Sequence, residues 1–243
     1  ILYPALQKRL GNYTGGKTGS FDKLEGSIDR IGSVEFIDQN PIGKSTRSNP
    51  VTYIKAYDAI RDLFSSQVLA TSRGYKPQHF SFNVDGGRCE VCQGEGEVVV
   101  EMQFMADLHL PCESCKGKRF KDEILEVEFK SKNISDVLNM TIDEAMEFFK
   151  DQKSVLQKLK PLQDVGLGYV QLGQSSSTLS GGEAQRIKLA SFLAKSSYSE
   201  KILFFFDEPT TGLHFHDISK LMNSFNALID MGHSIIIIEH NLD

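Results

Sequence analysis

Four cysteines form two pairs whose spacing suits a metal ion. The pairs are Cys89 with Cys92 and Cys112 with Cys115. Two cysteines at this spacing can reach one ion together, and two such pairs supply the four thiolates of a closed, tetrahedral Zn²⁺ site. Because a closed site has no open position for a reactant, the predicted role is structural. An adventitious disulfide pair or an iron–sulfur cluster is the alternative.

A pair of carboxylates stands at the end of an apolar run. Asp207 and Glu208 directly follow residues 202–206, which have the composition of a buried parallel strand. Ligands bind at the ends of such strands. We therefore expect Asp207 to hold Mg²⁺ through water and Glu208 to orient and deprotonate an attacking water. A solvated acidic loop is the alternative.

Residues 179–186, Leu-Ser-Gly-Gly-Glu-Ala-Gln-Arg, predict the start of a helix that can receive a phosphate. Ser180 and Glu183 are spaced as a capping box, which marks the first turn. Gly181 and Gly182 allow a phosphate to approach the backbone N–H groups and the positive end of the helix dipole. A capped helix without a ligand is the alternative.

Together these two motifs resemble those of the ABC-type ATPases, whose signature loop is LSGG and whose strand ends in Asp-Glu. The resemblance implies ATP with Mg²⁺ as the ligand. It also implies that His240, after the apolar run 235–238, contacts the γ-phosphate. Gln39, after the predicted strand 33–38, would sense Mg²⁺ and the attacking water. A structural histidine and an ordinary strand-end glutamine are the alternatives.

No phosphate-binding P-loop is predicted, although residues 11–18 match the pattern GxxxxGK[ST]. A working P-loop follows a strand and opens a helix, whereas residues 1–10 have a helical pattern and residues 19–27 do not. Residues 43–45, Gly-Lys-Ser, lack the earlier glycine. Since a helical pattern opens directly at Ile1, we expect a fragment of a longer protein, without ATPase activity of its own.

A basic cluster surrounds the cysteines. It comprises Arg88, Lys116, Lys118, Arg119 and Lys121. The chain carries a net charge of −5, so only a local patch of this kind could bind DNA, through the phosphates and with little sequence preference. A solvated surface run is the alternative.

The elements around these motifs predict an α/β protein. Apolar residues make up 40% of the 243 positions and charged residues 24%, which is typical of a soluble globular protein, and no apolar run is long enough to span a membrane. We expect no signal peptide. The patterns predict strands at 33–38, 97–105, 124–129, 202–206 and 234–238, and helices at 1–10, 51–65, 141–149, 181–195 and 216–230.

The order of the motifs narrows the resemblance to the UvrA family, the damage-sensing subunits of bacterial excinucleases. The similar segments are residues 37–54, 80–120, 179–193, 207–214 and 238–243. The resemblance implies a partial ABC-type ATPase core of parallel sheet and helices at 1–60 and 201–243. It also implies an inserted α+β signature domain at 61–200, which contains the zinc module at 86–121 and the LSGG helix.

This family resemblance further implies a cytoplasmic, homodimeric ATPase that recognises lesions in double-stranded DNA and loads UvrB. Ser180, Gly181 and Gly182 would complete an ATP site whose P-loop lies in the other ATPase half. Another ABC-class ATPase, such as a transporter motor or a chromosome-maintenance protein, is one alternative. A zinc-knuckle module of the DnaJ co-chaperone type is another, although Arg119 departs from the DnaJ repeat CxxCxGxG.

Overall fold

The structure of the chain, a computed structural model, forms two compact units. The described residues are 1–11, 15, 18–43, 45, 47–102, 104, 107–195, 199–213 and 215–240. Unit 1 comprises Ile1–Pro41, Asp164–Leu167 and Ser180–Asp243, and unit 2 comprises Ile42–Gln163 and Gly168–Leu179. The carboxylates at 207 and 208 therefore belong to unit 1, and the four cysteines belong to unit 2.

Unit 1 is built on a parallel sheet of three strands. They are β1 (Ser33–Ile37), β6 (Ile202–Asp207) and β7 (Ser234–Ile238), in the order β1-β6-β7. Ile37 lies opposite Phe206, and Asp207 lies opposite Ile238, so the carboxyl ends of all three strands share one edge. The strands predicted at 33–38, 202–206 and 234–238 are confirmed, and so is the parallel type expected of the last two.

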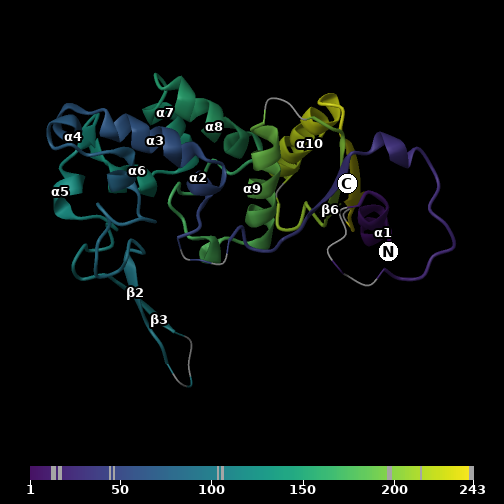
Figure 1. Cartoon of the computed structure of the whole chain (residues 1–243), viewed down its shortest axis with the longest axis horizontal. Coiled ribbons are helices and arrows are strands. Elements are labelled where there is room, and N and C mark those ends of the chain that lie inside the picture. Colours follow the sequence, from purple (N-terminus) through teal and green to yellow (C-terminus); the bar gives the residue numbers. More distant parts are fainter. Residues whose placement is uncertain are drawn as a thin grey trace. The chain divides into compact units, whose positions relative to one another are not determined.

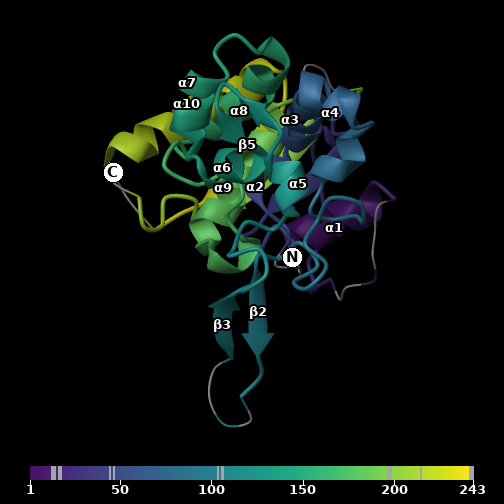
Figure 2. The same ribbon diagram turned by 90° about the vertical axis from the view of Figure 1, so that its left-hand side faces the viewer.

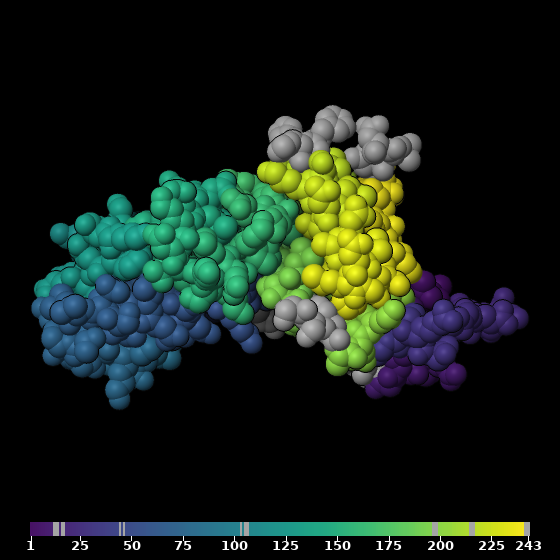
Figure 3. All heavy atoms as spheres, turned by 90° about the horizontal axis from the view of Figure 1, so that it is seen from above, coloured from purple at the N-terminus to yellow at the C-terminus, as the bar shows by residue number. Residues whose placement is uncertain are grey.

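Both faces of the central strand β6 are buried, which explains its uninterrupted apolar sequence. Three helices cover the sheet: α1 (Leu2–Arg9), α9 (Gly181–Leu193) and α10 (Phe215–Asp230). Phe205 packs with Leu6 of α1 on one face. On the other face, the rings of Phe204 and Phe192 of α9 lie 4.9 Å apart between centroids. Figure 3 shows the atoms of α10 and the segment after it, in yellow, as one continuous block.

Unit 2 consists mainly of short helices around an aromatic core. Its helices are α2 (Pro50–Tyr53), α3 (Ala56–Ser65), α4 (Val68–Ser72), α5 (Asp122–Leu125), α6 (Ile134–Asn139), α7 (Ile142–Phe148) and most of α8 (Lys153–Asp164). The rings of Phe64, Phe80, Phe82, Phe120 and Phe149 are almost completely buried. The chain thus combines α and β elements with a small parallel sheet, as predicted. None of the described helices is long and apolar enough to cross a membrane.

Two hairpins complete unit 2. One pairs β4 (Glu128–Phe129) with β5 (Lys132–Asn133), and the other pairs β2 (Glu97–Val100) with β3 (Leu108–Pro111). The β2–β3 hairpin extends away from the helices of its unit (Figures 1 and 2). The strand predicted at 97–105 is therefore too long. The backbone N–H of Met102 instead donates to the carboxylate of Asp107 at 3.2 Å, which helps to turn the chain back.

Two other sequence predictions are wrong. The helix predicted at 51–65 is divided into α2 and α3, because Lys55 between them has a left-handed backbone with φ of 59°. The strand predicted at 124–129 begins as helix α5. Its neighbouring residues Ile124 and Leu125 are both buried, which an alternating strand with one buried face does not allow.

The two compact units divide the chain differently from the predicted domain bounds. Residues 42–60 belong to unit 2, and helix α9 belongs to unit 1. The side chain of Gln185 in α9 explains the second difference. Its Nε2 donates to the carbonyl of Ile37 at 2.7 Å and to the carbonyl of Asp207 at 3.0 Å, so α9 is bound to the ends of two sheet strands.

Candidate functional site

The four cysteines form a compact, buried set of sulfur atoms, here called the four-cysteine cluster (Cys89, Cys92, Cys112 and Cys115). Their Sγ atoms all lie within 4.8 Å of one another. Cys89 and Cys112 are 3.9 Å apart at Sγ, and Cys92 and Cys115 are 3.7 Å apart. Four thiolates around one tetrahedral Zn²⁺ are expected about 3.8 Å apart, given Zn–S bonds of about 2.3 Å. The residues therefore fit a single structural zinc ion.

The same distances exclude the disulfide alternative in this structure, in which all four cysteines are free thiols. A disulfide needs the two sulfurs about 2.05 Å apart. Sulfurs that converge this closely on a common centre also suit one ion better than a cluster of several irons. The soft thiolate set suits zinc, and the complete set of four ligands leaves no position for a reactant.

Each cysteine pair is followed by a turn that points backbone N–H groups at sulfur. The N–H of Gly96 donates to Cys92 Sγ at 3.3 Å. Gly94 and Gly96 have φ of 85° and 82°, and in the second pair Gly117 and Arg119 have φ of 80° and 71°. Glycine adopts this region without strain. Arg119 thus takes a glycine-like backbone conformation, and the two turns share one form.

Burial opposes ionisation of part of the four-cysteine cluster. Burial raises the pKa of the Cys92 thiol, and it raises the pKa of Cys115 to about 12. At Cys89 burial also raises the pKa, but hydrogen bonds from the backbone of Cys92 and Val91, together with those to the thiols of Cys92 and Cys115, outweigh burial and lower the pKa to about 7. Since thiolates are the metal-binding form, four buried thiolates require a positive charge among them, which a zinc ion would supply.

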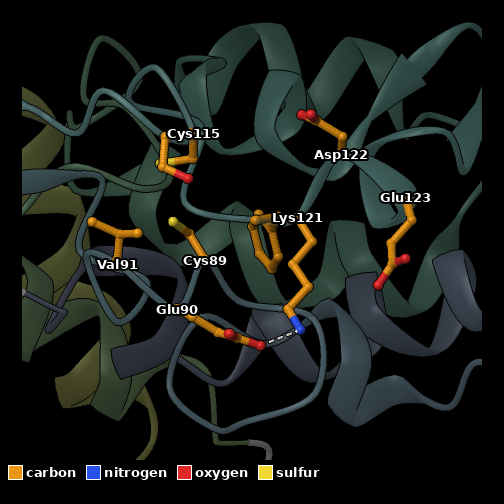
Figure 4. Close-up of a pocket in the computed structure, with 9 residues that line it drawn as sticks. Cys89, Glu90, Val91, Cys115, Lys121, Asp122 and Glu123 are labelled. Atoms are coloured by element: carbon orange, nitrogen blue, oxygen red, sulfur yellow. Dashed lines mark hydrogen bonds and ion pairs between the residues drawn. The ribbon is translucent and has the colours of Figure 1, made fainter.

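The basic residues near the cluster are held in different ways. Lys121 donates from Nζ to Glu90 at 2.5 Å, beside Cys89 and Cys115 in the pocket of Figure 4. Arg88 donates from Nε to Asp85 at 3.0 Å. These two cations are therefore already paired with carboxylates.

Arg119 is held most firmly. Its Nη2 donates to the carbonyl of Gly173 at 3.1 Å, and its guanidinium lies 5.4 Å from the centre of the Phe82 ring. Burial lowers the pKa of this guanidinium. Lys116 and Lys118, by contrast, are exposed. The predicted patch therefore offers two exposed lysines on the second turn rather than five equivalent cations.

In unit 1, the strand ends bring four predicted residues to one place, here called the carboxyl edge (Gln39, Asp207, Glu208 and His240). Gln39 and Asp207 are 168 positions apart in the chain, yet Gln39 Nε2 lies 3.5 Å from the Asp207 carbonyl and 3.3 Å from the Glu208 carbonyl. The Nε2 of His240 lies 3.4 Å from Glu208 Oε1. The parallel register of β1, β6 and β7 produces this meeting.

Glu208 has an unusual backbone. Its φ is 46°, a left-handed conformation that costs a residue other than glycine about 1 kcal/mol or more. Its N–H still donates to the Ile238 carbonyl at 2.8 Å, and its carbonyl accepts from the N–H of Thr211 at 3.2 Å. The backbone thus turns sharply after Asp207. Such strain is common at functional sites.

The start of α9 has the predicted capping box. Ser180 Oγ accepts from the N–H of Glu183 at 3.3 Å, and Glu183 Oε2 accepts from the N–H of Ser180 at 2.7 Å. Gly181 lies against the carboxyl edge, because a Cβ at this position would be 2.9 Å from both Cβ and Oε1 of Gln39. Gly182 has more room, since its Cβ would be 3.4 Å from the Thr211 carbonyl.

Two residues of α9 that bind the strand ends and the loop carrying Gln39 were not predicted from the sequence. Gln185 donates to two strand-end carbonyls, as described above, and Lys188 donates to the carbonyl of Asn40 at 2.8 Å. Their spacing of three positions places them on one side of a helix. That spacing is a detectable signal, but only the structure identifies what the side chains face.

The elements on either side of residues 11–18 do not support a P-loop there. Helix α1 precedes residue 11, and residues 18–27 contain no helix. A working P-loop has the opposite context. Lys17 of this match, Lys44 of the second match, and residues 214 and 241–243 of the family-like segments lie outside the described residues.

Comparisons of sequence show that the chain is similar to proteins named UvrABC system protein A. It is 54% identical to UvrABC system protein A of Clostridium perfringens, over the whole chain and 26% of that protein. The corresponding values are 52% and 26% for the protein of the same name from Aquifex aeolicus, and 52% and 25% for that from Thermus thermophilus. The chain spans about a quarter of the length of these relatives. No protein-family model matches it.

A comparison of structures agrees with this relationship. The chain resembles the crystal structure of UvrA2 from Deinococcus radiodurans with a TM-score of 0.84 and a sequence identity of 47%. The match covers 90% of the chain and 27% of the solved protein. At this identity the likeness extends beyond the general fold.

Proposed function

The chain belongs to the UvrA family, and on this basis we propose that it works as part of the ATPase subunit of the bacterial nucleotide-excision-repair excinuclease. One observation carries the proposal within the chain. The carboxyl edge gathers an amide, two carboxylates and an imidazole at the ends of three parallel strands. These are the groups that metal-assisted hydrolysis of a nucleotide requires.

Each group at the carboxyl edge has a proposed role. Asp207 holds Mg²⁺ through water, because hard cations prefer oxygen ligands. Glu208 orients and deprotonates the attacking water. Gln39, whose amide already lies beside both residues, contacts the Mg²⁺ and the water. His240 contacts the γ-phosphate of ATP. The bound Mg²⁺ supplies charge neutralisation for the phosphates.

The start of α9 serves a different nucleotide in this proposal. Ser180, Gly181 and Gly182 complete an ATP site whose P-loop is provided by another part of the full-length protein. The capped first turn supports this assignment, since the N-terminus of a helix favours an anion. We therefore expect no ATP turnover by the chain alone. The proposal keeps the predicted functional domains. These are an ATP-binding core at residues 1–60 and 201–243, and a signature domain at residues 61–200.

We further propose that the full-length protein is a homodimer that binds lesions in double-stranded DNA and loads UvrB. The four-cysteine cluster holds one structural Zn²⁺, which shapes the surface that presents Lys116 and Lys118. Arg88, Arg119 and Lys121 act mainly by holding this surface in place, because each has partners within the chain. Any DNA contact by the two lysines is with phosphates.

The ATPase role is tested by Glu208→Gln in the full-length protein. We expect kcat for ATP hydrolysis to fall about 100-fold or more, because a general base contributes about 10²–10⁴-fold. Nucleotide binding should persist, since the amide keeps the shape of the side chain. Glu25→Gln is the matched control, because Glu25 forms an exposed pair with Lys23 in the same unit. Hydrolysis by Glu208→Gln at the wild-type rate would refute the assignment.

The DNA role is tested by a salt series on duplexes with and without a lesion, in the presence and absence of ATP. For the variant Lys116→Gln/Lys118→Gln, we expect the slope of log K against log salt to decrease by about 0.9 for each phosphate that the protein no longer neutralises. Lys150→Gln, which removes an exposed pair with Glu147, is the control. An unchanged slope would exclude these lysines, and equal binding to both duplexes would exclude lesion recognition.

A further inference from the structure

Lys188 of α9 makes an unusually complete set of contacts with the loop that carries Gln39. Its Nζ donates to the carbonyl of Asp38 at 3.1 Å, to the carbonyl of Asn40 at 2.8 Å, and to the carboxylate of Asp38. Its side chain is only 14% exposed. An ammonium has three donors, so this one lysine can be fully satisfied by the two residues that flank Gln39.

The ion pair between Lys188 and Asp38 is more than a surface contact. The Asp38 side chain is 36% exposed, and the side-chain amide of Asn40 also donates to it. Burial acts to raise the pKa of the Asp38 carboxyl, but the hydrogen bond and charge of Lys188, together with the hydrogen bonds from Asn40, outweigh burial and lower it. The carboxylate therefore stays ionised, and the attachment of the loop to α9 is maintained at neutral pH.

Gln185 anchors the same helix from the next turn. The residue is 2% exposed, and its amide joins the last carbonyl of β1 to the carbonyl of Asp207 in β6. While Gln185 holds α9 against the strand ends, Lys188 binds both residues that flank Gln39 in the loop after β1. Gln39 is the middle residue of that loop, and its amide lies 3.3 Å from the Glu208 carbonyl.

We propose that Lys188 is a positioning residue for ATP hydrolysis, which fixes residues 38–40 to α9 so that Gln39 stays beside Asp207 and Glu208. The inference rests on the proposed ATPase function and goes beyond it by adding a residue that touches neither nucleotide nor metal. It also has a mechanical consequence. Because α9 starts at Gly181, a displacement of this helix would also move the loop at residues 38–40. The first turn of α9 and Gln39 of the carboxyl edge would then shift together.

The test uses steady-state ATP hydrolysis by the full-length protein. For Lys188→Gln we expect kcat to fall about 10- to 100-fold, the scale of a small misplacement of a catalytic group. KM for ATP should change less than about twofold, because Lys188 does not contact the nucleotide in this proposal. The Mg²⁺ concentration for half-maximal rate should rise. Lys188→Arg, which keeps the charge, should recover part of kcat.

A double-mutant cycle with Gln39→Ala separates positioning from general stability. If Lys188 acts through Gln39, then Lys188→Gln should lower kcat little further in the Gln39→Ala background. Lys220→Gln is the matched control, since it removes a lysine ion pair with Asp217 on α10 of the same unit. Thermal unfolding of each variant identifies any loss of kcat that comes from a loss of folded protein.

The outcomes distinguish this inference from the proposed function. Independent, multiplicative effects of Lys188→Gln and Gln39→Ala, or a wild-type kcat for Lys188→Gln in a protein that Glu208→Gln inactivates, would overturn the role of Lys188 alone. A wild-type full-length protein that hydrolyses no ATP would overturn the proposed function itself.

Discussion

The four-cysteine cluster and the carboxyl edge are assembled in opposite ways. The four cysteines lie within one short stretch, are buried, and satisfy the geometry of one ion among themselves. The carboxyl edge draws on residues as far apart in the chain as Gln39 and His240 and is open, with 84% of the His240 side chain and 44% of the Glu208 side chain exposed. A closed structural site can be complete locally, whereas an open site must leave room for a substrate and is held from outside by α9.

Removing one ligand of the four-cysteine cluster should have the largest effect. We expect Cys112→Ser, at a completely buried position, to reduce bound zinc from about one equivalent per chain to near none, because closed zinc sites need all four ligands. Unfolding of the region around the cluster should follow, since metal binding and folding are coupled. Metal analysis and thermal unfolding of the chain measure both effects.

Ser114→Ala, in the same turn but exposed, is the control for that variant. Wild-type protein without zinc would contradict the metal assignment directly. Zinc retained at one equivalent by Cys112→Ser would show that the cluster is less closed than its geometry indicates.

The next largest loss of stability is expected from substitutions of glycine in the turns of the four-cysteine cluster. An alanine at Gly94 would have φ of 85°, and its Cβ would overlap the Phe82 carbonyl. Gly74 has φ of 70° but nothing within reach of an added Cβ. We expect Gly74→Ala to cost about 1 kcal/mol from backbone strain alone, and Gly94→Ala to cost about 3 kcal/mol because a steric clash is added. Equal midpoints of denaturant unfolding would argue against the clash.

Beside the carboxyl edge, alanine substitutions of Gly181 and Gly182 at the start of α9 should differ by less in their effect on stability. Alanine in place of a helical glycine stabilises a helix by about 1 kcal/mol at most, so Gly182→Ala should be neutral or slightly stabilising. Gly181→Ala should instead destabilise by about 1–2 kcal/mol, because its Cβ would press on Gln39. Calorimetry of the two variants measures the difference, and the opposite order would show that Gln39 moves away freely.

The smallest effect on stability is expected from His233, at the opposite end of the same sheet. This effect should depend on pH. His233 Nδ1 accepts the N–H of Ile202 at 3.1 Å, and its ring lies edge-on to Phe204. Burial first, and then the charge of Lys201, lower the pKa of this imidazole. The folded state therefore binds a proton less readily than the unfolded state, so its stability is complete above about pH 6.5 and declines as pH falls through the lowered pKa.

His233→Asn retains a hydrogen-bond acceptor for Ile202 but does not titrate. We expect the difference in unfolding midpoint between about pH 7.5 and about pH 5.5 to be smaller in this variant than in the wild type. A wild-type protein that becomes more stable on acidification through this range would contradict the direction of the shift.

The sequence was sufficient to place the candidate site residues on their local elements and to predict the main strands, but less so for their surroundings. Cys89, Asp207 and Ser180 were assigned to their elements correctly, because CxxC spacing, a strand-ending carboxylate and a capping box are local signals. The second arm of the β2–β3 hairpin was missed, since both of its strands are short and largely exposed. The predicted DNA role of Arg119 overlooked its internal partners, which depend on Phe82 and Gly173.

Local sequence patterns specify the candidate site groups and the turns that present them. Cysteine spacing and glycine positions specify the four-cysteine cluster because its ligands lie close together in the chain. The tertiary fold alone brings the Gln39 amide to the Asp207 carbonyl, and the Lys188 ammonium to the carbonyl of Asn40 beside Gln39. The physical reason is strand register, since parallel pairing of β1, β6 and β7 sets the distances between residues that no local pattern connects.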